Sequence, residues 1–427
     1  MNLESNTDDS SSLWRSSAFR RVWGADGTSD LARQSSIVVI PLIGALTLDA
    51  TPFQMGVLGA AATIPSLLIS LIAGVWVDRL APRTTMILAA LVRCLLALSI
   101  PVLWWLDFLT VWLLSGIVVL IGTTTLFFDL SRLAWLPALV GRRRLSDANG
   151  KMQASRSAAQ MIGPSAGGAV ASALSPPLAL LMDGPASLIS AVLLRGVPRE
   201  TGARRIERER TSIWRQAFDG MALSLRNPVL RATIGASGLT AFFGHIFLAV
   251  YVLYMATTLD LSSFEVGLVF GIGGAGALIG SFLAAPLAAR FGVGRTIAAG
   301  WLLFGLGGLP IPLAFMVPEY ALPLVIFSEF FQWMVLPVAE VNQLSLRQAI
   351  TPDRYLGRVA ASSRFFVSGM IPVGSLIGGT LGSLIGLPAT LLLGVGGMML
   401  AFGWIAISPV RSIRHLPAGA DETLERR

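Results

Sequence analysis

Twelve runs of mostly apolar residues, each long enough to cross a bilayer, follow one another along this chain of 427 residues. A helix needs about 20 such residues to cross a hydrocarbon core about 30 Å thick, and only helices or closed barrels satisfy their backbone hydrogen bonds there. None of the runs alternates between apolar and polar residues as a lipid-facing strand does, which excludes a barrel. We therefore predict an all-α membrane protein with twelve transmembrane helices, near residues 17–47, 53–77, 84–105, 109–131, 150–174, 177–194, 228–257, 263–289, 295–317, 320–346, 356–385 and 387–408.

The amino-acid composition excludes soluble proteins, disulfide-rich proteins and metalloproteins. Hydrophobic residues make up 54% of the chain and charged residues 13%, too few polar side chains to cover a soluble domain. One cysteine, Cys94, and two histidines, His245 and His415, leave no basis for a disulfide framework or a metal site, so we expect no metal and no cofactor. The chain also lacks a His-Glu-x-x-His pattern, a glycine-rich phosphate loop and a nucleophile–histidine arrangement, and we do not expect an enzyme.

The basic residues give the orientation in the membrane. All but one of the 32 are arginines, and they gather in alternate loops, whereas the intervening loops around Asp49, Asp107, Pro176, Asp260 and Glu319 contain none. Loops rich in arginine stay in the cytoplasm. We expect both termini there, including the tails 1–16 and 409–427. The net charge of +8 does not indicate nucleic-acid binding, because the arginines are spread over short loops.

The chain divides into two similar halves. One long polar connection, residues 195–227, separates a first bundle of six helices (17–194) from a second (228–408), and its later part has the spacing of an amphipathic helix. Ala154-Ser155-Arg156 with Pro164 is repeated as Ser362-Ser363-Arg364 with Pro372, 208 positions later. A weaker match relates the arginines at 79 and 83 to those at 290 and 295. Two pseudo-symmetric bundles that face each other across a cavity are an architecture of secondary transporters.

A motif between the second and third spans resembles a family signature. Gly74-Val-Trp-Val-Asp78-Arg79-Leu-Ala-Pro-Arg83 resembles the Gly-x-x-x-Asp-Arg-x-x-Arg/Lys signature of the major facilitator superfamily, at the same loop. The resemblance implies the twelve-helix major facilitator fold. It also implies a gate in which Asp78 contacts the start of the eleventh span and Arg79 or Arg83 pairs with Asp129 at the cytoplasmic side of the fourth.

A second motif indicates the direction of transport. Gly163-Pro164-Ser165-Ala166-Gly167-Gly168 in the fifth span is similar to the Gly-Pro-x-x-Gly-Gly element of antiporters in the same superfamily. Proline removes a backbone hydrogen bond and small residues allow close helix packing, so the segment suits either moving bundles or static packing.

Shorter stretches resemble a bacterial exporter branch that includes macrolide-efflux and enterobactin-export proteins, and this resemblance implies the inner membrane of a bacterial cell. The stretches are Thr51-Pro52-Phe53-Gln54-Met55-Gly56, Phe127-Phe128-Asp129, Leu136-Pro137-Ala138-Leu139-Val140, Gln153-Ala154-Ser155-Arg156-Ser157 and Gly357-Arg358-Val359. The first span departs from this branch at Ala32-Arg33, where relatives often carry Gly-Asp.

Ionisable residues inside the spans are costly to bury and therefore usually face a cavity or a partner. Our candidates for proton coupling or for the cavity are Asp30, Arg33, Asp183, His245, Glu329 and Glu340.

All of these candidates except Glu329 have a structural alternative. Asp30 and Arg33 can form a self-neutralising ion pair, Asp183 can cap a helix or hydrogen-bond between helices, and His245 can be a packing residue. Glu340 has Arg347 two turns further on, which favours a structural pair. Glu329 has no basic residue within one helical turn, which favours a proton-carrying role.

These features predict a monomeric exporter that uses the proton gradient to move a small amphipathic molecule, a drug or a siderophore-like metabolite, by alternating access. Its partners would be this cargo, protons and the lipid bilayer. The alternatives are a flippase for lysophospholipids or other lipids and a non-transporting sensor with the same fold.

Overall fold

The computed structural model describes residues 13–68, 81–141, 144–197 and 222–415, and no strand occurs in these ranges. A short 3₁₀ turn, Leu13–Arg15, precedes the first half. The helices of the first half are α1 (Ser17–Leu42, extended by a π-turn to Thr47), α2 (Pro52–Leu68), α4 (Pro82–Trp105), α5 (Val111–Val140), α6 (Leu145–Ala173), α7 (Pro176–Ala179) and α8 (Asp183–Arg195).

The helices of the second half are α10 (Pro228–Thr257), α11 (Ser263–Phe291), α12 (Val293–Gly308), α13 (Pro310–Leu313), α14 (Ala321–Ala349), α15 (Asp353–Ile385) and α16 (Leu387–Ala406). Short 3₁₀ turns precede α8 and α14 and follow α13 and α16.

The predicted all-α fold with twelve spans is confirmed. Among the described residues, nine helical segments are long and apolar enough to cross a membrane. The remaining three spans are α1 and α6, which carry more polar residues, and α2, whose described part is 17 residues long. Most of the connection 195–227 and most of both tails lie outside the described residues, so those boundaries stay predictions.

Two predicted spans are not continuous helices. The span expected at 177–194 consists of α7, a 3₁₀ turn and α8, and the span expected at 295–317 breaks after Gly308. Prolines follow both breaks closely, Pro185 in the first turn of α8 in the first case and Pro310 and Pro312 in the second. Proline lacks the N–H that a continuous helix needs, and hydropathy alone did not reveal these interruptions.

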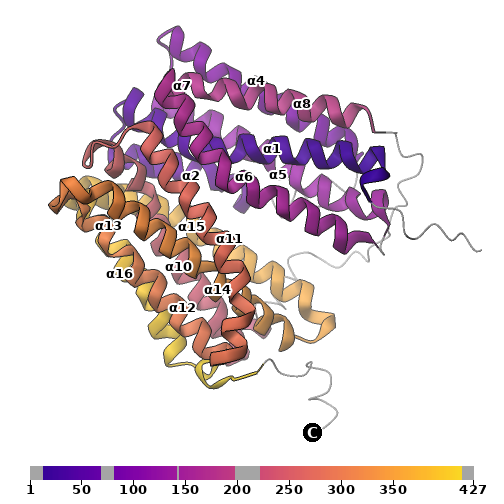
Figure 1. Ribbon diagram of the computed structural model, residues 1–427, viewed down its shortest axis with the longest axis vertical. Helices are drawn as coiled ribbons and strands as arrows, with labels where there is room; N and C mark the ends of the chain where they lie inside the picture. The colour runs from indigo at the N-terminus through magenta and orange to yellow at the C-terminus, as the bar shows by residue number, and fades with distance from the viewer. Residues whose placement is uncertain (1–12, 69–80, 142–143, 198–221, 416–427) are drawn as a thin grey trace, which may run out of the picture.

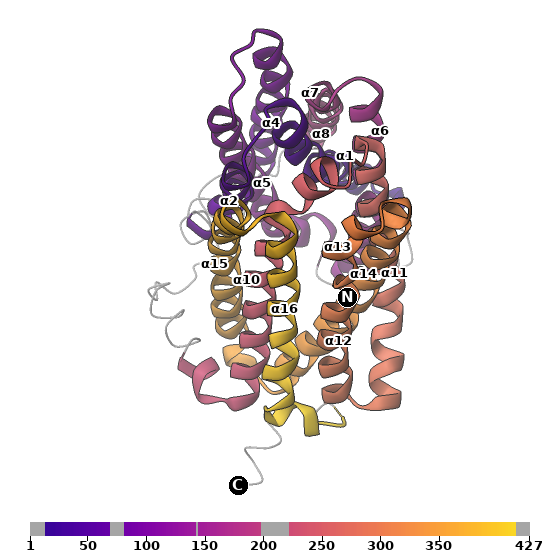
Figure 2. The same ribbon diagram turned by 90° about the vertical axis from the view of Figure 1, so that its left-hand side faces the viewer.

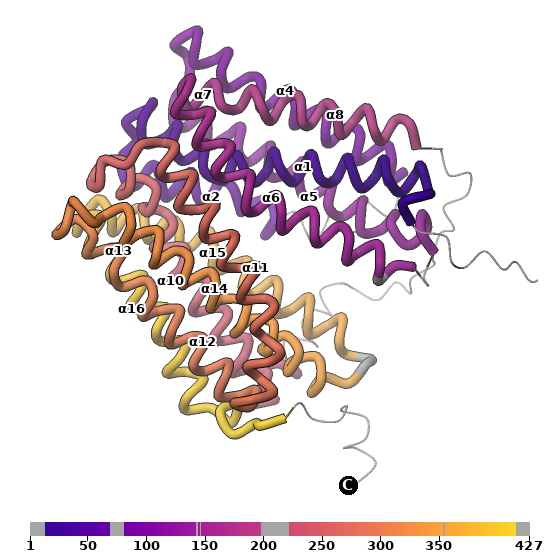
Figure 3. The backbone as a smooth tube through the Cα atoms, in the orientation of Figure 1, coloured from indigo at the N-terminus to yellow at the C-terminus, as the bar shows by residue number. Residues whose placement is uncertain are grey.

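The two halves form separate bundles (Figure 1, Figure 2). We call the end of the bundles with the turns at Asp49, Asp107 and Asp260 the aspartate end, and the opposite end, with Arg83 and Arg290, the arginine end. The halves lie close together at the aspartate end, beside α7 and α13, and their helices diverge towards the arginine end (Figure 1, Figure 3).

Glycines bring the two halves into contact at the aspartate end. Gly56 of α2 lies so close to Gly379 of α15 that a Cβ on Gly56 would come within 2.7 Å of the Gly379 Cα atom. Gly168 of α6 meets Gly267 of α11 in the same way, again at 2.7 Å. A hydrogen bond of 3.1 Å from the Phe53 amide to the Ser383 hydroxyl joins α2 and α15 nearby. These contacts close the space between the halves at this end.

The contacts give the internal repeat an interval that differs from the one predicted from the sequence. Gly56 and Gly267 are 211 positions apart (267 − 56), and so are Gly168 and Gly379 (379 − 168), so the two seams are related by the pseudo-symmetry of the halves. The segment before each first glycine repeats with the same interval: Thr47-Leu-Asp-Ala-Thr-Pro-Phe-Gln-Met-Gly56 corresponds to Thr258-Leu-Asp-Leu-Ser-Ser-Phe-Glu-Val-Gly267.

Both copies fold alike. Asp49 and Asp260 have positive φ angles of 45° and 55°. The helix that follows begins with reciprocal hydrogen bonds between side chain and backbone, between Thr51 and Gln54 in the first half and between Ser262 and Glu265 in the second. Such a capping box satisfies backbone N–H groups that the first helical turn leaves free. The short sequence repeat therefore has a structural reason.

The match predicted at an interval of 208 is one helical turn out of this register. Gly163 packs against Gln34 in the first half, and Gly374 packs against His245 in the second. Gly374 follows Gly163 by 211 positions, and His245 follows Gln34 by the same interval. Arg156 and Arg364 are thus similar in sequence but not equivalent in place.

Candidate functional site

A cavity between the halves opens towards the arginine end. It has two lobes of about 780 and 990 Å³. The first is lined by both halves, and the second by helices of the second half. His245, Phe270 and Arg364 line both lobes, which makes the cavity continuous. The second lobe extends to Thr351 and Leu356, in the connection between α14 and α15 at the arginine end.

Two ion pairs connect α1 with α5 beside the first lobe. The Arg33 guanidinium contacts both Asp30, one turn away on α1, and Asp129 on α5, the latter at 3.1 Å. Asp26 is 3.0 Å from the Nε atom of Arg132 on α5. The expected pair of Asp30 with Arg33 is present. A second pair, Asp26 with Arg132, lies next to it towards the arginine end, and neither residue was among the candidates from the sequence.

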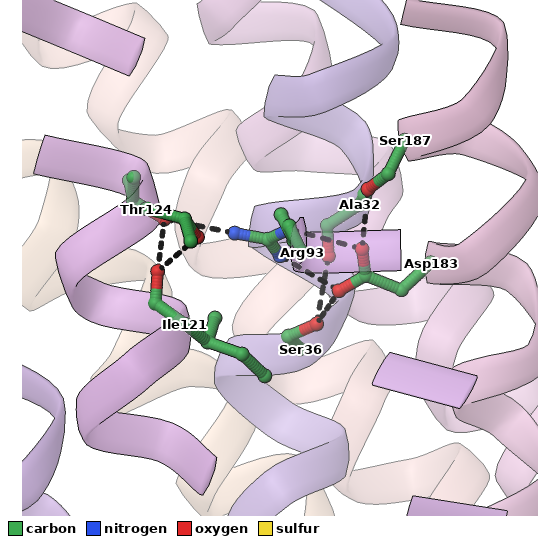
Figure 4. A network of polar contacts seen from close by, with 8 residues as sticks. Ala32, Ser36, Arg93, Ile121, Thr124, Asp183 and Ser187 are labelled. Carbon is green, nitrogen blue, oxygen red and sulfur yellow. Dashed lines mark hydrogen bonds and ion pairs between the residues drawn. The ribbon is translucent and has the colours of Figure 1, made fainter. Parts of the chain in front are cut away.

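A third ion pair lies deeper in the first half (Figure 4). Arg93 of α4 donates two hydrogen bonds to the Asp183 carboxylate of α8, of 3.0 Å from Nε and 2.7 Å from a terminal nitrogen. Asp183 also accepts hydrogen bonds from the hydroxyls of Ser36, at 2.6 Å, and Ser187, at 3.1 Å.

Arg93 also donates a hydrogen bond of 3.0 Å to Thr125 on α5. The network therefore ties together α1, α4, α5 and α8, which is the interhelical alternative for Asp183. Arg93 was missed as its partner. The available signal was that two opposite charges, Arg93 and Asp183, each lie inside an apolar span.

The buried acid of the second half, Glu329, is held by hydrogen bonds, and within the described ranges it forms no ion pair. Glu329 of α14 is 2% exposed and lines the second lobe. The Tyr251 hydroxyl donates a hydrogen bond of 2.8 Å to one of its oxygens and the Trp333 indole N–H donates one of 2.7 Å to the other. Among the residues that the structure describes, no cation lies within ion-pair distance of Glu329. Tyr251, on α10, could not be found as its partner from local spacing.

Glu340 and His245 also line the second lobe. The charge of Arg347 acts on Glu340, but in the described part of the chain the two do not form an ion pair within 4.0 Å, so the close structural pair expected from the sequence is absent. Arg347 instead donates a hydrogen bond to Ser363 of α15. The Nδ1 atom of His245 lies 2.8 Å from the Ala241 carbonyl oxygen, one turn earlier on α10.

The gating motif falls partly outside the described residues, which include neither Gly74 nor Asp78 nor Arg79. Arg83 does not contact Asp129, contrary to one of the two predicted pairings. Its guanidinium donates hydrogen bonds of 3.1 and 2.6 Å to the carbonyls of Leu194 and Arg195 at the end of α8. A cation there satisfies carbonyl groups that the last helical turn leaves free and complements the helix dipole.

The small residues of the antiporter-type motif lie at two interfaces of α6. Gly163 and Gly167 allow α6 to approach α1 at Gln34 and Ser35, within the first half. Gly168 instead faces α11 across the seam between the halves, and the neighbouring Pro164 contributes its carbonyl to the same seam beside Gly267. The motif therefore joins a static packing surface to a contact between the halves.

Comparisons with known proteins agree with this architecture. The family model described as the Major Facilitator Superfamily matches residues 23–251. The chain is 26% identical over 392 residues to an uncharacterized MFS-type transporter, y4rN of Sinorhizobium fredii, covering 89% of this chain and 92% of that protein.

Solved structures show the same fold at low sequence identity. A bacterial homologue of the iron transporter ferroportin, in an inward-facing state, superposes with a TM-score of 0.68 at 19% identity, covering 93% of this chain and 99% of the other. The nucleoside transporter NupG gives a TM-score of 0.71 at 12% identity, with 91% and 99% covered.

Proposed function

This chain belongs to the major facilitator superfamily and is a multi-pass membrane transporter, and on that premise we propose that it exports a small amphipathic molecule from a bacterial cell in exchange for protons. The cargo would be a drug or a siderophore-like metabolite. The observation that carries the proposal is a cavity between two pseudo-symmetric halves that is closed at one end and open at the other. It is lined by a buried carboxylate that pairs with no cation in the described part of the chain.

The shape of the cavity supports loading from the cytoplasm. Arginine-rich loops face the cytoplasm by the positive-inside rule, and the cavity opens at the arginine end. The seams at Gly56 and Gly168 close the aspartate end, which would face outwards. Opening these seams while the arginine end closes would release cargo outside, as in the rocking of two repeats around a central site.

Glu329 is the proposed coupling residue. The described acids Asp26, Asp129 and Asp183 of the first half are each paired with an arginine, so a proton there would compete with an arginine. Glu329 is held by two neutral donors instead, and an ionised carboxylate buried without a cation costs several kcal/mol. The Tyr251 hydroxyl can donate to the ionised acid or accept from the protonated acid. Proton binding at Glu329 therefore changes the relative energies of two conformations that bury it differently, which couples proton and cargo.

Reconstituted vesicles test the coupling. We expect an imposed pH gradient to drive accumulation of an amphipathic dye such as ethidium by the wild-type protein. Glu329→Gln should lose gradient-driven accumulation while retaining exchange of labelled for unlabelled dye at equal concentrations, because exchange needs no net proton movement. Glu319→Gln, the same change in a turn at the aspartate end, is the matched control and should behave as wild type. Accumulation that ignores the gradient would overturn the proposal, and a fluorescent lysophospholipid in the same vesicles tests lipid transport.

A further inference from the structure

The second half contains counterparts of the two ion pairs between α1 and α5. Arg132 and Asp26 correspond, 211 positions later, to Gln343 and Ser237, and these two residues also contact each other, through a hydrogen bond of 2.6 Å between the Gln343 side-chain amide and the Ser237 hydroxyl. The ion pair of the first half is thus replaced by a neutral hydrogen bond in the second, with both charges removed together. This pairing fixes the register of α10 against α14.

The ion-pair cluster around Arg33, which also includes Asp30, has kept only one of its three charges. One turn along α14 from Gln343, Glu340 corresponds to Asp129, and two turns along α10 from Ser237, Gly244 corresponds to Arg33. The acid of α14 is kept, whereas the arginine and the acid of α1 are replaced by Gly244 and by Ala241, which corresponds to Asp30. The second half therefore presents a carboxylate opposite a position from which the cation is missing.

The space at Gly244 is open. A Cβ added there would meet only the sulfur of Met398, at an ordinary contact distance of 3.7 Å, whereas Cβ atoms on most other glycines of α10 and α11 would clash. Both Gly244 and Glu340 line the second lobe, and the Glu340 side chain is exposed to it. A group that enters this lobe thus has room beside Gly244 to take the place that the Arg33 side chain has in the first half.

The surroundings suit an organic cation. Aromatic rings make up much of the wall of the lobe, from Tyr251, Phe270, Trp301, Phe304 and Trp333. Their faces attract cations and their edges pack against apolar groups. Two arginines, Arg347 and Arg364, also line the lobe. Arg347 is held by Ser363, and Arg364 lies at the junction with the first lobe, so neither occupies the position opposite Glu340.

We propose that the cargo carries an organic cation, and that this cation binds Glu340 in the space at Gly244, where the first half places the guanidinium of Arg33. The inference rests on the proposed transport function, since it assigns the cargo of the same cavity. It also separates two acids by role: Glu329 exchanges protons, and Glu340 recognises the cargo charge. The incomplete repeat explains why recognition belongs to the second half, because Asp30 and Asp129, the described counterparts in the first half, already contact Arg33.

Equilibrium binding to the purified protein in nanodiscs tests the site directly. The probes are tetraphenylphosphonium and tetraphenylborate, which have nearly the same shape and opposite charges, with empty nanodiscs subtracted. We expect the wild type to bind the cation more tightly than the anion, and Glu340→Gln to weaken binding of the cation about 10- to 100-fold, as expected for loss of one charge-assisted contact. Glu319→Gln removes a carboxylate at the aspartate end and should leave both affinities unchanged.

A second variant rebuilds the lost ion pair. Gly244→Arg should abolish binding of the cation and leave the melting temperature equal to or above that of the wild type, because its guanidinium pairs with Glu340 as Arg33 pairs with Asp129. Should this variant fail to fold, Glu340→Gln remains decisive. Equal affinity for the two probes, or an unchanged affinity of Glu340→Gln for the cation, would overturn the proposal.

The binding experiment can contradict the cation site without contradicting proton-coupled transport, and the transport experiment can do the reverse. Binding at equilibrium needs no gradient, so loss of charge preference in a protein that still shows gradient-driven flux contradicts the cation site alone. Flux that ignores the gradient, with charge preference intact, contradicts proton coupling alone.

Discussion

The ion pair between Arg93 and Asp183 should make a large contribution to the stability of the first half. The Asp183 side chain is 2% exposed and that of Arg93 is 8% exposed, so removal of either partner leaves the other as an uncompensated buried charge. Such a loss costs about 3–5 kcal/mol. For a bundle of this size, each kcal/mol lowers the melting temperature by about 2–4 °C, so Asp183→Asn and Arg93→Met should each melt about 6–20 °C below the wild type.

The double variant distinguishes a buried charge from a lost contact. Arg93→Met combined with Asp183→Asn removes both charges and keeps an amide that Ser36 and Ser187 can still bond, so it should melt higher than either single variant. Asp147→Asn, which breaks an exposed ion pair with Lys151, is the control, and its loss should be about 0.5 kcal/mol or less. Melting of the purified protein in detergent, followed by tryptophan fluorescence, measures all four. A double variant as unstable as the sum of the single variants would refute the reasoning.

Two further predictions concern the aspartate end. Gly168→Leu should hold this end open, because even its Cβ would lie 2.5 Å from the Ser263 carbonyl oxygen. A cysteine introduced at Phe53 should then react faster with a membrane-impermeant maleimide. An unchanged reaction rate would contradict the closed contact between Gly168 and Gly267. Thr51→Ala and Ser262→Ala each remove one capping hydrogen bond at equivalent helix starts and should cost about 1 kcal/mol apiece in thermal melts, whereas a loss in only one half would contradict their equivalence.

The fold was predictable because hydrophobicity and arginine placement act locally. A run of about 20 apolar residues indicates each span, and each arginine-bearing loop indicates the cytoplasmic side of the membrane. The interruptions before α8 and after α12 were not predicted, since an apolar run keeps its hydropathy whether or not prolines break its helix. The internal repeat was found with the wrong interval, because the similarity of Arg156 and Arg364 is more conspicuous than the capping segments that the structure shows to be equivalent.

In the candidate site, contacts within one helix could be predicted from the sequence, but contacts between helices could not. Spacing along one helix indicated that Asp30 and Arg33 could pair, since three residues bring side chains together on one face. Partners on other helices, such as Arg93 for Asp183 and Tyr251 for Glu329, depend on how the bundle packs, and no local pattern specifies that. The missing counterpart of Arg33 at Gly244 became visible only after the contacts of both halves had fixed the register.

Alternating exposure of the cavity is tested most directly by distances between spin labels at its two ends. In a Cys94→Ala background, one pair of labels replaces Leu133 of α5 and Phe365 of α15, which line the first lobe, and a second pair replaces Phe53 of α2 and Leu384 of α15 at the aspartate end. Between the wild type and Glu329→Gln, which imitates the protonated acid, the account predicts distance changes of opposite sign at the two ends. Changes of the same sign, or no change at either end, would contradict it.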